Sequence, residues 1–291
     1  MIKFSVIIPT YNRASDLDRC LASLVTQTFT DFEVIICDDG STDNTKSVVD
    51  SYCNRLDVKY IWQENWGGPA RPRNSGIKLA QADWICFLDS DDWWYSNKLE
   101  ECFKYLDSAD VIYHDLDVYD KTLRGPLKRL HSRQLSDDPF TDLMLDNNAL
   151  FNSSVVVKKS ILNQVGGLTE DKKLISVEDL DCWLKISKIT RKFLYLPESL
   201  GAYYIEANIS RGIKHSDSLE ALGHKYISDL HSDKVRARVT RILRYNQARI
   251  CHINHHYGRA GRLYWRAGLR VLAEKMFRYF STKIINNGKK Y

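Results

Sequence analysis

Three carboxylates stand close together in the segment Asp89-Ser90-Asp91-Asp92, directly after the apolar run Trp84–Leu88. Like charges held this close raise one another's pKa, and a bound cation relieves that repulsion. Carboxylate oxygens suit Mg²⁺ or Mn²⁺, which proteins hold through one or two carboxylates while substrate phosphates and water complete the shell. The segment therefore predicts a divalent-metal site. The alternative is a solvated turn that caps the helix expected from Asn97.

The first 120 residues alternate between strand-like and helix-like patterns, which indicates βαβ units around a mainly parallel sheet. Apolar, β-branched runs alternate with segments whose apolar residues recur at helical spacing. The expected helices are residues 17–25, Asn74–Ala82 and Asn97–Leu106. The expected strands are Lys3–Ile8, Phe32–Cys37, Val58–Trp62, Trp84–Leu88 and Val111–Val118.

Polar clusters follow three of the expected strands at the point where each strand ends. Thr10–Arg13 follows the first strand, Asp38–Ser41 the second, and the acidic segment 89–92 the fourth. In parallel sheets ligands bind outside the carboxyl ends of the strands. We therefore expect the three clusters to meet at one edge of the sheet and to form the binding site.

Beyond residue 120 the pattern becomes less regular. Residues 120–150 are polar and are interpreted as a long loop, followed by a strand at Ala149–Val157. Glu178–Ser187 has helical spacing, and Phe193–Tyr204 returns to a strand pattern. The sequence is helical and basic from about residue 216 onward, so we expect a larger domain at 1–212 and a helical C-terminal region at 213–291.

The 291-residue chain has a net charge of +5 that is unevenly distributed. Residues 211–291 contain 18 Lys and Arg against 5 Asp and Glu, so the remainder of the chain is acidic. A basic tail favours an anionic partner, either nucleic acid or an anionic membrane surface. The N-terminus lacks a signal-peptide pattern, and no run approaches the roughly 20 apolar residues of a membrane span, so we expect a cytoplasmic protein.

Six motifs occur in an order that resembles the inverting glycosyltransferases of family 2. The resemblance extends over about residues 3–210 and implies the GT-A fold, in which helices flank a Rossmann-like, mainly parallel central sheet. It implies a nucleotide-binding half at 1–118 and an acceptor half at 119–212. The motifs are VIIPTYNR at 6–13, CDDGSTDNT at 37–45, GGPARPRNSGI at 67–77, FLDSDDWW at 87–94, VGGLTED at 165–171 and VEDLDCWLKI at 177–186.

The resemblance implies a UDP-sugar donor and assigns residues to it. Pro9, Tyr11 and Asn12 would line the uracil-ribose pocket. Asp39 would accept a hydrogen bond from uracil N3–H, since a carboxylate is an acceptor-only group. The Arg-Asn pair near the base and diphosphate would be Arg73 and Asn74, although Arg71 stands close by. The donor-binding residues expected are therefore Pro9, Tyr11, Asn12, Asp39, Arg73, Asn74, Asp89 and Ser90.

The resemblance also separates metal binding from proton transfer. Asp91 would ligate Mn²⁺ or Mg²⁺ at the diphosphate, and Asp89 would contact the ribose or the metal. Asp179 would be the general base that deprotonates the acceptor hydroxyl. Glu178, Asp92, Trp93 and Trp183 are secondary candidates: Asp92 either assists the metal or caps the next helix, and each Trp either stacks on a sugar or belongs to the core. Directly after Tyr203-Tyr204, where many relatives carry a His that binds the metal, this sequence has Ile205, Glu206 and Ala207. His215 comes later and is interpreted as a solvated loop residue.

Together these features imply a non-processive inverting transferase that moves a hexose from a UDP-sugar, with UDP-glucose and UDP-galactose as the leading donors. The acceptor would be a saccharide on polyprenyl diphosphate in surface-polysaccharide (O-antigen or capsule) biosynthesis. One alternative is a nucleotide-sugar-binding protein without transferase activity, which Glu178-Asp179 argues against. A nucleic-acid-binding protein that acts through residues 211–291 is another, but that interpretation leaves the acidic N-terminal domain unexplained.

The C-terminal region contains a basic amphipathic pattern between Arg259 and Tyr279. Such a helix can lie in an anionic membrane interface, and the resemblance favours this contact, at the inner face of the plasma membrane. The alternatives are packing on the catalytic domain and a contact between copies of the chain. The apolar positions are Trp265, Leu269, Leu272, Met276 and Tyr279, and the basic ones are Arg259, Arg262, Arg266 and Arg270.

Overall fold

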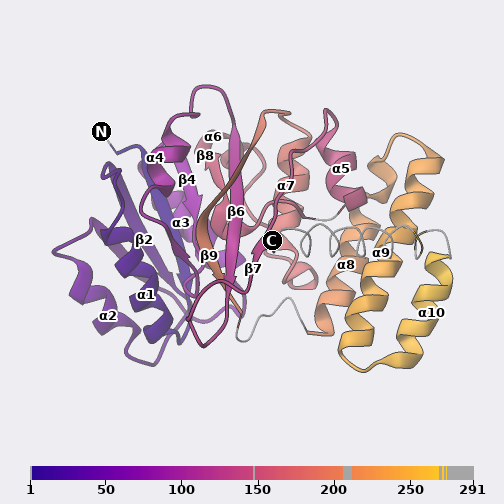
Figure 1. Cartoon of the computed structure of the whole chain (residues 1–291), viewed down its shortest axis with the longest axis horizontal. Coiled ribbons are helices and arrows are strands. Elements are labelled where there is room, and N and C mark those ends of the chain that lie inside the picture. The colour runs from indigo at the N-terminus through magenta and orange to yellow at the C-terminus, as the bar shows by residue number, and fades with distance from the viewer. Residues whose placement is uncertain (1, 147, 206–211, 269–270, 272, 274–291) are drawn as a thin grey trace, which may run out of the picture. The chain divides into compact units, whose positions relative to one another are not determined.

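The computed structural model describes the whole chain except residues 1, 147, 206–211, 269–270, 272 and 274–291 (Figure 1). The chain forms two compact units. The first comprises Met1–Glu170 and Glu178–Ala207, and the second comprises Asp171–Val177 and Asn208–Tyr291. The segment 171–177 belongs to the second unit through the contact of the short 3₁₀ helix η2 (Lys172–Leu174) with α8 (Lys214–Tyr226).

The first unit is built on a single mixed sheet. Its strand order is β3-β2-β1-β4-β8-β6-β9-β5, and β7 pairs with β6. The first four strands run parallel to one another, as the βαβ pattern predicted. Beyond them β8 is antiparallel to both β4 and β6, and β6 and β9 are parallel. The strands are β1 (Phe4–Thr10), β2 (Phe32–Asp38), β3 (Val58–Trp62), β4 (Trp84–Phe87), β5 (Trp93–Trp94), β6 (Val111–Tyr119), β7 (Lys128–Leu130), β8 (Val156–Lys158) and β9 (Phe193–Tyr204).

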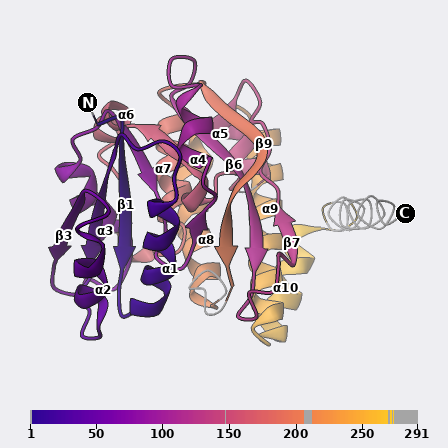
Figure 2. The same ribbon diagram turned by 60° about the vertical axis from the view of Figure 1, so that its left-hand side comes forward.

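Helices cover both faces of this sheet (Figure 2). Alternate residues of β1, such as Val6 and Ile8, join a core cluster with Leu17 and Leu21 of α1. Ile7 points to the opposite face, where α3 lies. Burial on both faces explains the continuous apolar runs of β1 and β2, because a parallel strand covered on two sides has no polar face. The helices are α1 (Ala14–Val25), α2 (Thr45–Tyr52), α3 (Ala70–Leu79), α4 (Lys98–Phe103), α5 (Pro139–Asp146), α6 (Lys159–Gln164) and α7 (Glu178–Ser187).

Gly76 sets how closely α3 approaches the sheet. A Cβ at this position would lie 2.6 Å from Ile7 Cγ2 and 3.0 Å from Cys37 Sγ. We expect Gly76→Ala to destabilise the protein by about 1–3 kcal/mol, because extra carbon in a packed core forces backbone shifts. Thermal unfolding followed by circular dichroism would measure the loss. Gly258→Ala is the control, since a Cβ there meets nothing within 4 Å; an equal loss in both variants would contradict this account.

The interpretation of residues 120–150 as one long loop is wrong. That segment contains β7, which extends the sheet beside β6, and the helix α5. The strand expected at Ala149–Val157 is also shorter, because residues 152–154 form the 3₁₀ helix η1 and β8 begins only at Val156. Both errors concern polar segments whose structure depends on pairing with distant strands rather than on local periodicity.

In the second unit three helices pack in sequence, α8 on α9 (Asp233–Ile253) and α9 on α10 (Tyr257–Ala267). α10 ends at Ala267, and Gly268 has a positive φ of 84°, so the continuous helix expected between Arg259 and Tyr279 is interrupted there. No described helix is long and apolar enough to cross a bilayer. The predicted positions Leu269, Arg270, Leu272, Met276 and Tyr279 lie outside the described residues.

Candidate active site

The acidic segment 89–92 forms a tight turn at the carboxyl end of β4. Leu88 N–H still bonds to the Ile7 carbonyl at 3.1 Å, and the turn closes with Asp92 N–H on the Asp89 carbonyl at 3.0 Å. Asp89 N–H donates to Ser153 Oγ at 3.1 Å. The strand pairing and Ser153 together fix the turn beside the ends of β1 and β2, at the sheet edge where the sequence predicted a site.

Asp92 is held internally by two hydrogen bonds. Its carboxylate accepts from Ser153 Oγ at 2.5 Å and from Tyr204 N–H at 2.9 Å. The side chain is almost fully buried, and burial followed by the charges of Asp91 and Asp89 raises its pKa well above the usual value. Helix α4 starts at Lys98 after Asn97, so of the two alternatives for Asp92 the one in which it caps this helix is wrong. Asp92 instead ties the turn to the end of β9.

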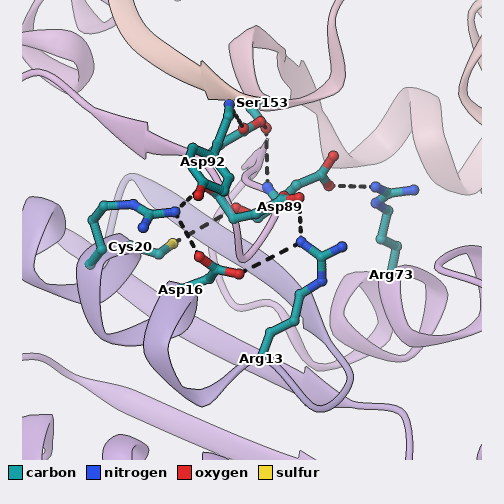
Figure 3. Close-up of polar contacts among 10 residues, drawn as sticks. Arg13, Asp16, Cys20, Arg73, Asp89, Asp92 and Ser153 are labelled. Carbon is teal, nitrogen blue, oxygen red and sulfur yellow. Dashed lines mark hydrogen bonds and ion pairs between the residues drawn. The ribbon is translucent and has the colours of Figure 1, made fainter. Parts of the chain in front are cut away.

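Asp91 forms an ion pair with Arg13, the residue that precedes α1 (Figure 3). Burial, and then the charge of Asp89, raise the pKa of the Asp91 carboxyl, which Arg13 partly counteracts. Arg19 from the same helix donates to the Asp91 carbonyl at 2.8 Å. Helix α1 thus brings two guanidinium groups to the acidic turn. A nucleoside diphosphate bound at this turn would also need cationic groups beside its phosphates.

The donor set of the turn fits a hard divalent cation. The described residues contain no group of three or more His, Cys, Asp or Glu placed to hold a metal ion. Asp89 and Asp91 can therefore supply at most a two-carboxylate set, which is how Mg²⁺ sites that also use substrate phosphates are built. After burial, the charge of Asp89 contributes most to raising the pKa of Asp91, and a cation bound to both carboxylates would offset that repulsion.

Arg73 connects the acidic turn to α7. Its side chain is only 4% exposed and pairs with Asp89 (Figure 3). It also donates to Glu178 at 3.1 Å. A buried guanidinium between two carboxylates holds both in a fixed geometry. Arg71 is exposed and pairs with Glu170 at 3.2 Å instead. Of the two arginines flanking Pro72, Arg73 is therefore the one at the site.

Asp179 begins α7 beside Glu178 and is half-buried. Its carboxylate accepts hydrogen bonds from the Asn148 amide at 2.9 Å and from Leu180 N–H at 2.7 Å. Burial, and then the negative charge of Glu178, raise the pKa of Asp179 to about 7. A carboxylate with a pKa near neutrality that is reachable from solvent has the properties of a general base.

Asn12 ties together the loops that follow β1 and β2. Its side-chain oxygen accepts from Thr42 N–H at 2.8 Å, its own N–H donates to Ser41 Oγ at 2.8 Å, and its φ is +50°. Pro9 lies within β1, whereas the ring of Tyr11 is 49% exposed beyond it. Of these three candidates, Tyr11 is thus the one whose side chain is free to contact a ligand.

Asp39 holds the loop after β3. Its carboxylate accepts from the Gln63 side chain at 3.1 Å, Trp66 N–H at 3.1 Å and Gly67 N–H at 3.2 Å. The preceding Asp38 shapes its own turn, accepting from Ser41 N–H at 2.7 Å and Tyr60 Oη at 2.6 Å. A uracil base that bound at Asp39 would therefore meet a carboxylate whose orientation is already fixed by backbone N–H donors.

The side chain of Asn74 is committed to the loop before α7. It accepts from Leu168 N–H and donates to the Leu168 carbonyl, both at 2.9 Å, and donates to Glu170 at 3.0 Å. Gly167, at a φ of +70°, is required beside it, because a Cβ there would lie 2.5 Å from Asn74 Oδ1. The side chain of Asn74 thus supports this loop and does not face a ligand.

The aromatic candidates divide into one core and one half-buried residue. Trp183 is fully buried and packs on Phe87 with ring centroids 6.1 Å apart, so the suggestion that it stacks on a sugar is wrong. Trp93 is half-buried, lies 4.8 Å from the Tyr119 ring, and has the Arg19 guanidinium 5.0 Å from its centroid. Ser90, between the two site carboxylates, is buried.

Besides Arg19, three residues of the site were not anticipated from the sequence. Asn148 contacts Asp179, Asn152 donates to Asp89 Oδ1 at 3.3 Å, and Ser153 binds both Asp89 N–H and Asp92. They precede β8, in a segment interpreted as loop and strand. The one available signal was the polar run DNNALFNSS at 146–154, directly before an apolar strand.

The family model for glycosyl transferase family 2 matches residues 5–166, more than half of the chain. The chain belongs to this family. Its sequence is 29% identical to the poly(ribitol-phosphate) beta-N-acetylglucosaminyltransferase TarP of Staphylococcus aureus, over 79% of this chain and 71% of TarP. It is 42% identical to the S. aureus enzyme TarS over 117 residues, which cover 38% of this chain but only 20% of TarS.

Solved structures agree with the α/β fold. The crystal structure of S. aureus TarS 1-349 in complex with UDP-GlcNAc superposes with a TM-score of 0.63 at 25% identity, covering 86% of this chain and 72% of that one. The mannosyltransferase PcManGT of Pyrobaculum calidifontis, in complex with GDP-Man and Mn²⁺, gives a TM-score of 0.65 at 16% identity over 99% of this chain and 81% of that one. The central sheet flanked by helices is thus the GT-A fold.

Proposed function

We propose that this chain is a non-processive inverting glycosyltransferase that moves a hexose from a UDP-sugar to a saccharide acceptor. One observation carries the proposal: Asp179, whose pKa is about 7, lies next to Glu178, and Glu178 is joined through Arg73 to Asp89 of the acidic turn. This chain of contacts holds a candidate base and a candidate donor site in one rigid arrangement. Family membership and the match to a UDP-GlcNAc-bound structure support it.

The proposed reaction is a single displacement. Asp179 takes the proton of the acceptor hydroxyl, whose oxygen attacks the anomeric carbon from the side opposite UDP, so an α-linked donor gives a β-glycoside. Asn148 orients the base, and Arg73 holds Asp89 in place. Asp91 and Asp89 would hold Mn²⁺ or Mg²⁺, which when bound supplies Lewis-acid stabilisation of charge on the leaving diphosphate. Arg13 and Arg19 supply further positive charge at the same turn.

A screen of UDP-sugars tests this function. UDP-glucose, UDP-galactose and UDP-GlcNAc are each incubated with the protein and Mn²⁺, and UDP release is measured with and without a polyprenyl-diphosphate-linked saccharide. We propose glucose or galactose as the transferred sugar and surface polysaccharide as the product. UDP release that needs both metal and acceptor supports transfer, whereas UDP-sugar binding with no release would support the alternative of a binding protein.

The pKa of Asp179 predicts the pH dependence of transfer. The base must be ionised, and its pKa is about 7. The fraction of protein in which Asp179 is ionised, and which is therefore active, is nearly complete above this pH and is lost as the pH falls through it. We expect kcat/KM to decrease about tenfold per pH unit on the acid side. Initial rates between pH 5 and pH 9 measure this, and a flat acid limb would contradict the assignment.

Glu178→Gln provides a matched test of the cause of this pKa. The variant removes the negative charge that, after burial, contributes most to raising the pKa of Asp179. The acid limb of the pH profile should therefore move to lower pH, because the carboxylate form of Asp179 is no longer opposed by its neighbour. A shift to higher pH would contradict the electrostatic account.

We also propose that the C-terminal helices bring the protein to an anionic membrane surface at the cytoplasmic face. Ala260 and Ala267 of α10 are buried, while Trp265 is 87% exposed and Arg262 and Arg266 are exposed on the same helix. An exposed Trp beside arginines suits a lipid interface. This contact would bring the protein to the membrane that carries a lipid-linked acceptor.

Substituting both Arg262 and Arg266 with Ala should weaken binding to vesicles that contain anionic lipid by about 30-fold, at about 1 kcal/mol per basic residue. Co-sedimentation at low and high salt measures the change. The control replaces the exposed Lys121 and Lys128 of the first unit with Ala. Equal losses in the two double variants would show that net charge, not α10, drives the association.

A further inference from the structure

Asn152 is a buried polar residue whose hydrogen bonding is incomplete. The residue is 8% exposed, and its side-chain nitrogen donates to Asp89 Oδ1 at 3.3 Å. The neighbouring carboxylate fixes the orientation of the amide, since the opposite orientation would set two acceptors against each other. The side-chain oxygen, Oδ1, is left with no hydrogen-bond partner in the described part of the chain.

The same contact network contains two more such atoms. Glu178 is 6% exposed, and its Oε2 has no hydrogen-bond partner among the described residues, although Oε1 binds Arg73. Arg73 Nε likewise has no hydrogen-bond partner among those residues. Three elements, η1, α3 and α7, therefore contribute two unpaired acceptors and one unpaired donor to the contact network Asn152–Asp89–Arg73–Glu178. Buried polar groups are nearly always paired, so their gathering at one site indicates a ligand that completes them.

The chemistry of these atoms selects the ligand group. A phosphate oxygen has no proton to donate, so the acceptors Asn152 Oδ1 and Glu178 Oε2 would repel it. An aliphatic hydroxyl both donates and accepts, and so can satisfy either acceptor while accepting from a guanidinium N–H. The donor proposed above carries hydroxyls on its ribose and on its hexose. The hexose is the sugar next to the base, because the base acts at its anomeric carbon, and Glu178 adjoins Asp179.

We propose that Asn152 Oδ1 accepts a hydrogen bond from a hydroxyl of the transferred hexose, with Glu178 as a second acceptor, so that Asn152 helps select the donor sugar. This inference rests on the proposed function, because it requires a nucleotide-sugar donor at the acidic turn. A site built to bind a hydroxyl rejects the analogue that lacks it, because its buried acceptor is then unpaired. Asn152 is thereby a specificity-determining residue for the hydroxyl pattern of the sugar.

The test compares UDP with UDP-hexose, using the full chain and Mn²⁺ in isothermal titration calorimetry. Asn152→Ala should raise the Kd for the best UDP-hexose about tenfold more than it raises the Kd for UDP, because UDP binding shares only the lost contact of Asn152 with Asp89. The control is Asn163→Ala, at an exposed Asn of α6, which should change neither Kd. Retained UDP binding also shows that the variant is folded. If Asn152→Ala does not fold, Asn152→Ser should give the same pattern.

Monodeoxy analogues of the UDP-hexose identify the hydroxyl. One analogue should bind wild type about tenfold more weakly than the parent donor, but bind Asn152→Ala no more weakly than the parent does. Equal weakening of UDP and UDP-hexose by Asn152→Ala would overturn the inference and place Asn152 in metal or diphosphate binding. Analogue losses that are the same in wild type and variant would also overturn it. Failure of the proposed function is distinct, because the UDP-release assay reports it: no UDP-sugar would then give release that needs metal and acceptor, whatever the titrations show.

Discussion

Asp179→Asn is expected to lower kcat by about 10²- to 10⁴-fold while the Kd for UDP with Mn²⁺ stays near the wild-type value. The range is the usual contribution of general-base catalysis. The substitution preserves shape and leaves the Asp89–Arg73–Glu178 contacts in place, so donor binding should persist. Initial rates of UDP release with acceptor, together with calorimetric UDP binding, measure the two quantities separately.

The matched control is Asp137→Asn, which removes one exposed carboxylate of the same domain and should transfer at the wild-type rate. The pH profile adds a second criterion. Wild type should show the acid limb set by the pKa of about 7 at Asp179, and the residual activity of Asp179→Asn should not. Wild-type kcat in Asp179→Asn would assign the base to another residue.

The elements that carry the site could be predicted where a local pattern sets them. Helix α7 and strand β9 occupy the expected ranges, Glu178–Ser187 and Phe193–Tyr204. Continuous apolar runs that end in polar turns identified the parallel strands. A strand buried on both faces lacks the alternation of polar and apolar residues, so its whole length forms one apolar run. The edge of the sheet that carries the polar clusters followed from strand direction alone.

The contacts that organise the site could not be predicted from local pattern. Ser153 joins Asp89 and Asp92 across more than 60 positions of sequence, through a 3₁₀ helix that has no periodic signature. The pairing of Arg13 with Asp91 spans 78 positions. It depends on how α1 begins, where Asp43 accepts from Ala14 N–H at 3.0 Å. Such contacts depend on how distant elements pack, which single-sequence patterns do not encode.

Trp183 illustrates the limit for side chains on a correctly predicted helix. Periodicity placed it on α7 but could not say whether its face meets a ligand or the sheet. The structure packs it on Phe87 of β4, so burial of a large ring stabilises the joint between α7 and the donor-binding half. Core packing of Trp183 thus holds α7, the helix that also carries Glu178 and Asp179, and the exposed aromatic candidate is Tyr11.

Asp91→Ala is expected to remove the metal-dependent part of UDP binding. In the presence of Mn²⁺ the Kd for UDP should rise by about a hundredfold, roughly 2.7 kcal/mol, because a metal stabilises diphosphate charge by several kcal/mol. Without metal the two proteins should bind UDP with similar affinity. Transfer should also be lost, so this variant and Asp179→Asn would lose activity for different reasons.

The control for Asp91 is Asp16→Asn. Asp16 pairs with Arg19 at 2.9 Å and lies 3.9 Å from Arg13, so it shares the cationic surroundings of Asp91 without belonging to the turn. It should keep Mn²⁺-dependent UDP binding. If Asp91→Ala and Asp16→Asn lose the Mn²⁺ dependence of UDP binding equally, the affinity for the diphosphate comes from Arg13 and Arg19 and not from the metal. If neither does, Asp91 is not a metal ligand, and its role reduces to fixing Arg13 at the start of α1.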